Sequence, residues 1–410
     1  MSINDLGNIF TFIGGLGMFL YGMNIMAEGL QKSAGDKMKR LLEILTKNRL
    51  VAILVGAGVT AIIQSSSATT VMVVGFVNAG IMNLSQAVGV IMGANIGTTM
   101  TSWLVSMSEW GKFFKPEFIA PLILGIGAFV IMFAKSEKNK EIAAVFVGFG
   151  ILFIGLSFMS DSITDYKDNP IFSQAFRTLG SNPILGILIG AGVTAIIQSS
   201  SASVGILQTL AMNGMVTWNS AIYITLGQNI GTCVTALISS AGTHKTARRA
   251  AIIHLLFNVM GAVIFGVAMF TIFKINTSFA SSTISSVQIS VFHTIFNVLC
   301  TVVMFPFANL LVKLSGLIVK DDKEDDEDDD VVETVRHLDE RILETPSFAI
   351  ENAVSEVSHM GNVTYRNTKM AMEAVLEGDD KKINQVMENE KAIDKMAKII
   401  SEYLVKLNNM

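Results

Sequence analysis

Residues 55–68 read Val-Gly-Ala-Gly-Val-Thr-Ala-Ile-Ile-Gln-Ser-Ser-Ser-Ala, and residues 189–202 repeat this stretch with a single change at its first position. Each copy lies in an apolar region that Gln-Ser-Ser-Ser breaks near its centre, leaving pieces of roughly 14 residues, or about 21 Å of helix. A helix of that length is too short to cross the hydrocarbon core of a bilayer, which is about 30 Å thick. The stretch therefore predicts two helical hairpins with polar tips.

The duplication extends to both sides of these hairpins. Residues 93–98 (Gly-Ala-Asn-Ile-Gly-Thr) return as residues 227–232 (Gly-Gln-Asn-Ile-Gly-Thr), at the same offset of 134 (227 − 93) that separates the two hairpin motifs. A register that holds over several motifs indicates a duplicated unit of about 130 residues. Upstream, a pair of glycines recurs at an offset of 133, namely Gly15 and Gly22 with Gly148 and Gly155.

The composition is that of a membrane protein. Hydrophobic residues make up 51% of the 410 residues, and residues 50–108 and 183–243 contain no Asp, Glu, Lys or Arg. A water-soluble domain could not carry such stretches without a large exposed apolar surface. Cys233 and Cys300 lie in apolar runs and do not indicate a disulfide framework. We predict an all-α, polytopic membrane protein that is not an enzyme, because no nucleophile-base set or nucleotide-binding glycine loop occurs.

The positions of Lys and Arg predict the topology. Seven apolar runs are long enough to span a bilayer. They are residues 6–30, 84–107, 118–134, 142–162, 219–240, 248–273 and 288–317. If each hairpin dips into the membrane and returns, each repeat has three spans. Because three is odd, the second copy is inverted relative to the first. The segments rich in Lys and Arg then lie on one side of the membrane. The opposite loops, 108–118 and 163–182, are balanced or acidic.

The positive-inside rule makes the basic side cytoplasmic. The N-terminus is then outside the cell membrane and the C-terminal region is in the cytoplasm. The two hairpin tips approach the midplane from opposite faces, as in transporters built from inverted repeats. The predicted organisation is membrane repeat 1 at 1–135 (hairpin at about 41–80), membrane repeat 2 at 136–275 (hairpin at about 183–214), a final transmembrane helix at 276–320, an acidic linker at 321–346 and a helical region at 347–410.

The hairpin tips are candidate anion-binding elements. Irregular backbone at membrane depth persists only where it lines a cavity, and a helix N-terminus there offers free N–H groups and roughly half a positive charge. Two such ends supply about +1, whereas monohydrogen phosphate carries about −2, so we expect Na+ to bind with the anion, with H+ coupling as an alternative. The candidate anion-binding residues are Gln64, Ser65, Ser66, Ser67, Gln198, Ser199, Ser200 and Ser201.

A second set of polar residues lies in the middle of two predicted spans. Glycine flanked by small polar residues is typical of a broken helix, so we predict helix breaks there and assign the polar residues to sodium or substrate binding. The alternative is that these small residues only allow close helix packing. The candidates are Asn95, Thr98, Thr99, Asn229 and Thr232.

Other intramembrane polar residues have less specific patterns. His254 and Asn258 repeat as His293 and Asn297 on consecutive spans, and for these we favour hydrogen bonds between helices over a transport role. Matching ends of the first helix of each repeat carry a carboxylate, Glu28 in one and Asp161 in the other. We interpret both carboxylates as solvated helix ends, with a role in coupling as the alternative.

Beyond the last span, residues 321–330 form an acidic run that is typical of a solvated linker. Residues 347–377 and 380–407 carry apolar residues at helical spacing, which predicts a helical hairpin. Glu390 and Asp394 are spaced i, i+4 and are weak candidates for a metal site, although a solvated helix face is the favoured interpretation.

Residues 5–316, with Gln-Ser-Ser-Ser twice and a Gly-x-Asn-Ile-Gly-Thr motif after each, resemble the type II sodium/phosphate cotransporter family. The resemblance implies Na+-coupled transport of inorganic phosphate, with both Gln-Ser-Ser-Ser segments at the substrate site and with Thr98, Thr99 and Thr232 near substrate or sodium. It implies no organic cofactor and no nucleic-acid partner, only phosphate, Na+ and the lipid bilayer. Association into a homo-oligomer is left open.

The C-terminal helices, with residues 338–346 before them, are similar to the PhoU-like regulatory domain of bacterial family members, in a partial form with two helices. Two alternatives therefore stay open. Beside sodium-coupled phosphate transport, these are a phosphate-sensing receptor that signals through this region, and a transporter or exporter of another small oxyanion.

Overall fold

The computed structural model describes residues 3–43, 48–110, 116–164, 166, 170–320, 338, 343 and 346–408. Over these residues the chain is almost entirely helical, and its β-structure is one isolated bridge between Thr217 and Thr283. This confirms the all-α expectation. Most of the predicted acidic linker, 321–346, lies outside the described residues.

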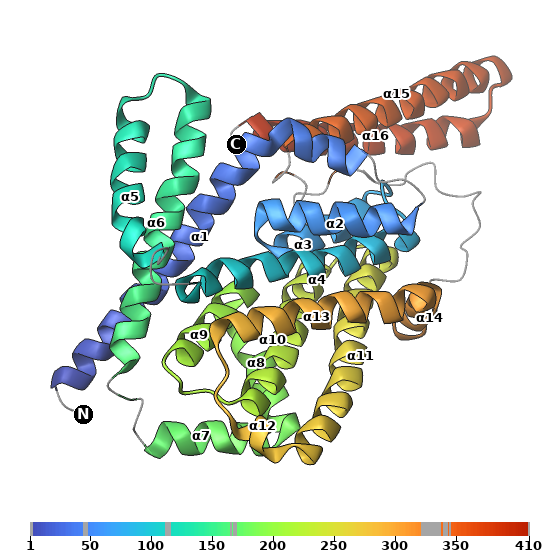
Figure 1. Cartoon of the computed structure of the whole chain (residues 1–410). Helices are drawn as coiled ribbons and strands as arrows, with labels where there is room; N and C mark the ends of the chain where they lie inside the picture. The colour runs from blue at the N-terminus through green and yellow to red at the C-terminus, as the bar shows by residue number, and fades with distance from the viewer. Residues whose placement is uncertain are drawn as a thin grey trace.

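From α1 to α14 the helices follow one another with short connections (Figure 1). In the described part of the chain they are α1 Ile3–Glu43, α2 Arg49–Ile63, α3 Ser66–Asn78, α4 Leu84–Ser106, η1 Met107–Glu109, α5 Pro116–Phe133, α6 Glu137–Thr164, α7 Pro170–Ser181, α8 Pro183–Ile197, α9 Ser200–Met212, α10 Trp218–Ser239, α11 Lys245–Ile275, α12 Thr277–Ser281, α13 Ser286–Met304, η2 Phe305–Phe307, α14 Ala308–Ile318, α15 Pro346–Glu377 and α16 Asp380–Asn408.

Six helical segments within the described residues are long and apolar enough to cross a membrane, which confirms a polytopic membrane protein. They belong to α1, α4, α6, α10, α11 and the continuous run Ser286–Ile318. The seventh predicted span, 118–134, corresponds to α5, whose apolar part Phe118–Phe133 is shorter. Several of its large apolar side chains are exposed, with Phe118 at 89% and Phe133 at 72%, as expected for a surface in contact with lipid.

One predicted connection contains a helix that the sequence did not predict. Residues 163–182, expected to be an extramembrane connection, contain the helix α7. Pro170 stands at the first position of this helix, where its missing N–H costs nothing. Phe176 and Leu179, three residues apart, pack against the core beneath. The helix was missed because it is short and only one of its faces is apolar.

The predicted helix breaks in the two Asn-Ile-Gly-Thr segments are wrong, because α4 and α10 run through them without interruption. The glycines serve close packing instead. A Cβ atom on Gly97 would come 2.6 Å from the carbonyl oxygen of Ala57 in α2, and one on Gly231 would come 2.5 Å from that of Ala191 in α8. The alternative interpretation, that these small residues allow close helix packing, therefore applies to the glycines. α2 packs on α4 as α8 packs on α10.

α1 and α6 cross at close range (Figure 1). A Cβ atom on Gly15 would lie 2.7 Å from the carbonyl oxygen of Gly155, and one on Gly148 would lie 2.6 Å from that of Gly22. The two helices are antiparallel, since the lower-numbered glycine of each meets the higher-numbered glycine of the other. Only residues without a side chain allow backbones to approach in this way.

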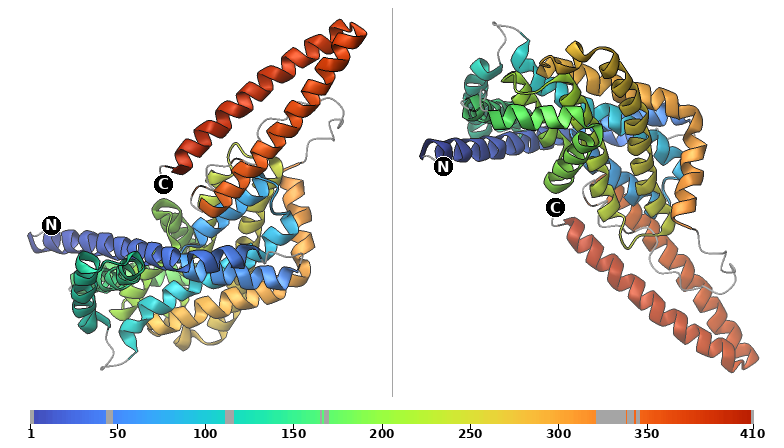
Figure 2. Two further views of the ribbon diagram at one scale, coloured as in Figure 1. Left: turned by 90° about the horizontal axis from the view of Figure 1, so that it is seen from above. Right: turned by 90° about the horizontal axis from the view of Figure 1, so that it is seen from below.

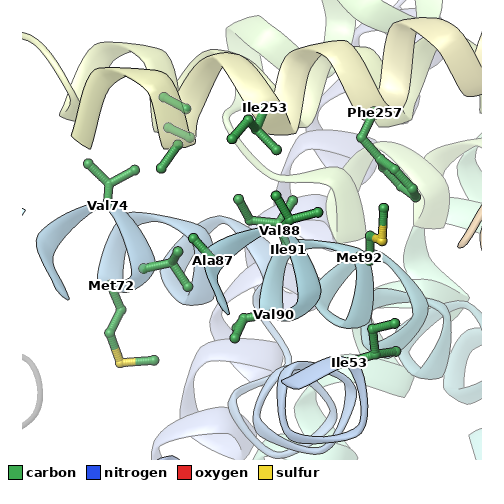
Figure 3. Packing of buried hydrophobic residues seen from close by; sticks show 14 of the residues in the cluster. Ile53, Met72, Val74, Ala87, Val88, Val90, Ile91, Met92, Ile253 and Phe257 are labelled. Carbon is green, nitrogen blue, oxygen red and sulfur yellow. The ribbon is translucent and has the colours of Figure 1, made fainter. Parts of the chain in front are cut away.

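The largest core cluster surrounds α4. Figure 3 shows Val88, Ile91 and Met92 of α4 beside Ile253 and Phe257 of α11, with the α2 residue Ile53 on another side of the helix. All of these side chains are at most 8% exposed. α4 is thus a central element that contacts both the first hairpin and the later helices.

The C-terminal helices α15 and α16 form an antiparallel hairpin that projects from the rest of the chain (Figure 2). Gly378 makes the turn with φ 66°, a left-handed conformation that glycine adopts without strain. These helices match the two predicted from the periodicity of residues 347–407.

Candidate functional site

Both Gln-Ser-Ser-Ser segments fold in the same way. α2 ends at Ile63 and α3 begins at Ser66, and in the second copy α8 ends at Ile197 and α9 begins at Ser200. The first serine of each motif is the N-cap of the second helix, because the Ser65 hydroxyl accepts a hydrogen bond from Ala68 N at 3.1 Å and the Ser199 hydroxyl accepts one from Ala202 N at 3.2 Å.

The glutamines at the two tips adopt an unusual backbone conformation. Gln64 has φ 57° and Gln198 has φ 55°, and they are the only residues other than glycine with positive φ in the described part of the chain. A left-handed residue with a Cβ atom costs free energy, and such strain is concentrated at functional sites. The tips therefore keep a glutamine side chain at a position where glycine would be easier to accommodate.

The two tips meet at one cavity of about 390 Å³. At about 30 Å³ per water molecule it has room for an oxyanion with its remaining hydration shell. Within the described residues its wall combines both hairpin tips with the middle of α1. The lining residues are Leu20, Met23, Asn24, Ala27, Glu28, Gln31, Ile63, Gln64, Ser65, Ser66, Ser67, Ala68, Gln198, Ser199, Ser200 and Ser201.

All eight residues predicted from the hairpin motifs line this cavity, although they differ in burial. Gln64, Ser66, Ser200 and Ser201 are between 4% and 7% exposed, whereas Gln198 is exposed. The Ser66 hydroxyl is buried and has no hydrogen-bond partner in the described part of the protein. A buried hydroxyl without a partner is costly unless a ligand or water satisfies it, so Ser66 is available to bind one.

Thr101 of α4 connects the two tips. Its hydroxyl donates to Gln64 Oε1 at 3.1 Å and accepts from the Ser201 hydroxyl at 3.4 Å. Gln64 Nε2 also donates to the carbonyl oxygen of Ala61, so the side chain is held at both ends. Sequence reasoning missed Thr101, although Thr235 at the 134-residue offset is a signal that could have found it.

The electrostatics of the cavity favour an anion only weakly. The N-termini of α3 and α9 both lie at its wall, each equivalent to roughly half a positive charge. None of the described lining residues is Lys, Arg or His, and Glu28 adds a negative charge. A doubly charged anion would therefore need cations beside it.

The five predicted sodium ligands do not line this cavity. They are buried on α4 and α10, with exposures between 3% and 7%. Thr98, Thr99 and Thr232 donate to carbonyl oxygens of their own helices, as does the Asn95 amide, which is 2.8 Å from Ile91 O. Their sodium role stays a prediction.

Asn229 differs from the other four, because it joins a network between helices. Asn229 Oδ1 is 3.1 Å from His293 Nε2, and Asn229 Nδ2 donates to Asn297 Oδ1 at 3.4 Å. This interhelical bonding agrees with the favoured interpretation of His293 and Asn297. For His254 the structure shows no such bond, since neither ring nitrogen has a partner among the described residues.

The carboxylates have unequal environments. Glu28 lines the cavity and accepts a hydrogen bond from Asn24 Nδ2 at 2.7 Å, whereas Asp161 is not part of the wall. In the tail, Glu390 lies 3.5 Å from Asn367 Nδ2. No group of three or more His, Cys, Asp or Glu side chains suited to a metal ion occurs in the described residues, so Glu390 and Asp394 have no further support.

Comparison with known proteins agrees with this architecture. Residues 18–161 and 168–283, more than half of the chain, match the family described as Na+/Pi-cotransporter. The chain belongs to that family. Residues 357–409 match the PhoU domain, over most of the α15–α16 hairpin. This is a family of transporters and not of enzymes, which confirms both the predicted family and the non-enzymatic assignment.

Several relatives cover the chain to different extents. YjbB of Salmonella typhimurium, named as a candidate inorganic phosphate export protein, is 27% identical over 94% of this chain and 67% of its own length. YqeW of Bacillus subtilis is 30% identical over 73% of this chain and 95% of its own length. The human sodium-dependent phosphate transport protein 2B is 30% identical over 33% of this chain and 22% of its own length. No solved structure matches.

Proposed function

We propose that the protein is a sodium-coupled secondary transporter of inorganic phosphate that works by alternating access around the cavity between the two Gln-Ser-Ser-Ser tips. The observation that carries this proposal is the shared cavity, which two segments 134 residues apart line together with two helix N-termini. The family match and the phosphate-related names of several relatives support phosphate as the substrate.

In this proposal, phosphate binds at the tips through backbone N–H groups of α3 and α9 and through serine hydroxyls. Ser66 offers a buried hydroxyl without a protein partner, and Ser65 and Ser199 fix the start of each helix. Thr101 holds Gln64 and Ser201 in place across the site. Hydrogen bonds to a charged group contribute about 1.5–3 kcal/mol each, so a few of them make a selective site.

Sodium coupling follows from the charge of the site. The two helix ends supply a charge of about +1. This does not balance the combined negative charge of an anion of about −2 and the Glu28 carboxylate. Since the described lining residues include no basic side chain, cations that enter with the anion would supply the difference. Asn95, Thr98, Thr99, Asn229 and Thr232 remain the proposed ligands nearby, reached in another state of the transport cycle.

The contacts between α1 and α6 support an inverted arrangement of the two repeats. In the repeat register Gly15 corresponds to Gly148 and Gly22 to Gly155. A twofold axis would therefore convert the contact between Gly15 and Gly155 into the contact between Gly148 and Gly22, and both contacts occur. For two antiparallel membrane-spanning helices such an axis lies in the membrane plane, which inverts one repeat relative to the other.

The short helices of the tips support re-entrant hairpins. α2 has 15 residues and α3 has 13. At 1.5 Å per residue these are about 22 Å and 20 Å long, less than a bilayer core. Together with the positive-inside rule, this supports an orientation with the N-terminus outside and α15–α16 in the cytoplasm.

The test is flux into proteoliposomes that contain the purified protein. Labelled phosphate uptake driven by an imposed Na+ gradient should exceed uptake driven by K+ or H+ gradients of the same size. Ser66→Ala combined with Ser200→Ala should abolish the Na+-driven component, while Ser358→Ala on the exposed surface of α15 serves as a matched control. Equal uptake with all three cations would reject sodium coupling, and competition by sulfate or arsenate in the same assay identifies another oxyanion substrate.

A further inference from the structure

Glu28 is the only carboxylate among the described residues on the cavity wall. Within the described part of the chain no Lys or Arg forms an ion pair with it, and its recorded partner is the neutral side chain of Asn24. A carboxylate has about four acceptor sites, and Asn24 uses one. A bare negative charge beside an anion site would repel the anion, so Glu28 requires a positive charge that the described residues of the cavity wall do not provide.

The same pair of side chains occurs in the second repeat. Asp161 corresponds to Glu28 and Ser157 to Asn24, both at the offset of 133 that relates the first helices of the repeats (161 − 28 and 157 − 24). The Ser157 hydroxyl lies 3.5 Å from Asp161 Oδ2, as Asn24 Nδ2 lies 2.7 Å from Glu28 Oε1. Each repeat therefore carries a carboxylate with a hydrogen-bonding side chain one helical turn before it.

The two carboxylates differ in what lies beside them. Next to Asp161, α6 is tied to the end of α9, because Asn213 Nδ2 donates to the Ser160 hydroxyl at 2.9 Å and Asn213 Oδ1 accepts from the Thr164 hydroxyl at 3.0 Å. Next to Glu28, the corresponding part of α1 borders the cavity through Ala27 and Gln31. The cavity therefore extends along α1 beside Glu28, whereas hydrogen bonds join α6 to the end of α9 beside Asp161.

We propose that Glu28 and Asp161 are the cation-capturing residues of two alternating vestibules, and that each binds Na+ on its own side of the membrane. This inference rests on the proposed function. When inverted repeats exchange conformations, each position acquires the surroundings of its counterpart, so Asp161 borders the cavity in the opposite state. A sodium ion held by the carboxylate and the neighbouring oxygen compensates the negative charge and stays close to the incoming anion. Glu28 and Asp161 thus set sodium affinity separately on the two faces.

The experiment measures the Na+ concentration that gives half-maximal phosphate flux in right-side-out and inside-out membrane vesicles. Glu28→Gln should raise this concentration about fivefold or more when Na+ is supplied on the Glu28 side, because a unit charge a few ångströms from the ion is lost. It should leave the value measured from the other side unchanged. Asp161→Asn should do the reverse, and Glu28→Asp should keep the wild-type value.

The control is Glu137→Gln, which removes an exposed carboxylate that is paired with Lys140 on the same helix as Asp161. A shift of equal size on both sides, or no shift with either variant while the wild-type protein shows Na+-driven flux, overturns this inference alone. Wild-type flux that does not depend on Na+ rejects the sodium coupling of the proposed function, and this inference with it. Monodisperse elution of each variant and retained sodium affinity on the unaffected side show that the variants are folded.

Discussion

Gly22 of α1 and Gly148 of α6 meet backbone to backbone, with no room for a side chain on either residue. A Cβ atom on Gly22 would be 2.6 Å from the carbonyl oxygen of Gly148, and it would also overlap the backbone nitrogen of Leu152. Since neither helix backbone can shift without disturbing the second contact at Gly15 and Gly155, the crossing is sterically fixed.

Gly22→Ala should therefore destabilise the protein, because overpacking at a backbone contact costs about 1–3 kcal/mol. Gly14→Ala and Gly17→Ala on the same helix are matched controls, as a Cβ atom at either position meets nothing within 4 Å. These two changes should be neutral or slightly stabilising, since alanine favours helix by about 1 kcal/mol over glycine. Thermal unfolding in detergent, followed by size-exclusion chromatography, separates the two outcomes. The prediction would be contradicted if the Gly22→Ala variant unfolded at the same midpoint temperature as the Gly14→Ala variant.

Thr101→Val should weaken phosphate binding without unfolding the protein. The change removes the hydroxyl that bridges Gln64 and Ser201 but keeps the shape of the side chain, so a rise of about threefold to tenfold in the KM for phosphate is expected from the loss of one or two hydrogen bonds. Thr101→Ser restores the hydroxyl and should restore the affinity. Ser106→Ala is the control, because this buried hydroxyl bonds only to Trp103 O in the same helix. An unchanged KM for Thr101→Val would exclude Thr101 from organising the site.

A disulfide between residues 160 and 213 should lock the transporter. The side chains of Ser160 and Asn213 are in contact at 2.9 Å, so Ser160→Cys with Asn213→Cys should crosslink in the state described here. Oxidation should stop phosphate flux, and a reductant should restore it. Cys233 and Cys300 are buried and provide little background. Crosslinked protein that still transports at the wild-type rate would be inconsistent with alternating access through this contact.

In the repeat register the counterparts of Ser160 and Asn213 are Ala27 and Ala79. Ala27→Cys with Ala79→Cys should crosslink only in the opposite state. The measurement is the yield of each crosslink with and without Na+ and phosphate. The two yields should change in opposite directions, and yields that rise or fall together would argue against exchange between mirrored states.

Removal of residues 321–410 distinguishes a transporter from a phosphate-sensing receptor. The described residues that line the cavity between the tips all precede residue 202, and α15 and α16 pack chiefly on each other. A chain that ends at Lys320 should therefore keep Na+-driven phosphate flux in proteoliposomes, with altered regulation. Absence of flux from both the full-length and the shortened protein, with both folded, would favour the receptor.

The sequence predicted the hairpin tips well because their motif is long and duplicated. Gln64 and Gln198 could be assigned to the hairpin tips from the break in an apolar run alone, and both line the cavity. The segment around Asn95 was misread as a helix break, because a glycine between small polar residues suits both an unwound helix and two tightly packed helices. Only the neighbouring helix α2 shows which of the two applies.

The positions of Thr101 and Glu28 beside the hairpin tips were harder to predict, because they depend on how α4 and α1 approach the tips. Their counterparts Thr235 and Asp161 were visible in the repeat register, but a register shows equivalence and not proximity. The difference between the two sides was also beyond prediction. Two nearly identical copies predict a symmetric site, whereas the structure buries Gln64 and exposes Gln198.

The hydrogen bonds of Asn213 have an energetic consequence for the whole cycle. If the two halves were identical, the inward and outward conformations would be related by a twofold rotation and would have equal free energy, so neither would be populated in excess. Any resting preference must then come from positions where the halves differ. Asn213 holds Ser160 and Thr164, whereas its counterpart Ala79 has no side chain able to do the same for α1. If the protein works by alternating access as proposed, this amide would favour the orientation in which it bonds α6, and bound ions and phosphate would have to overcome that preference.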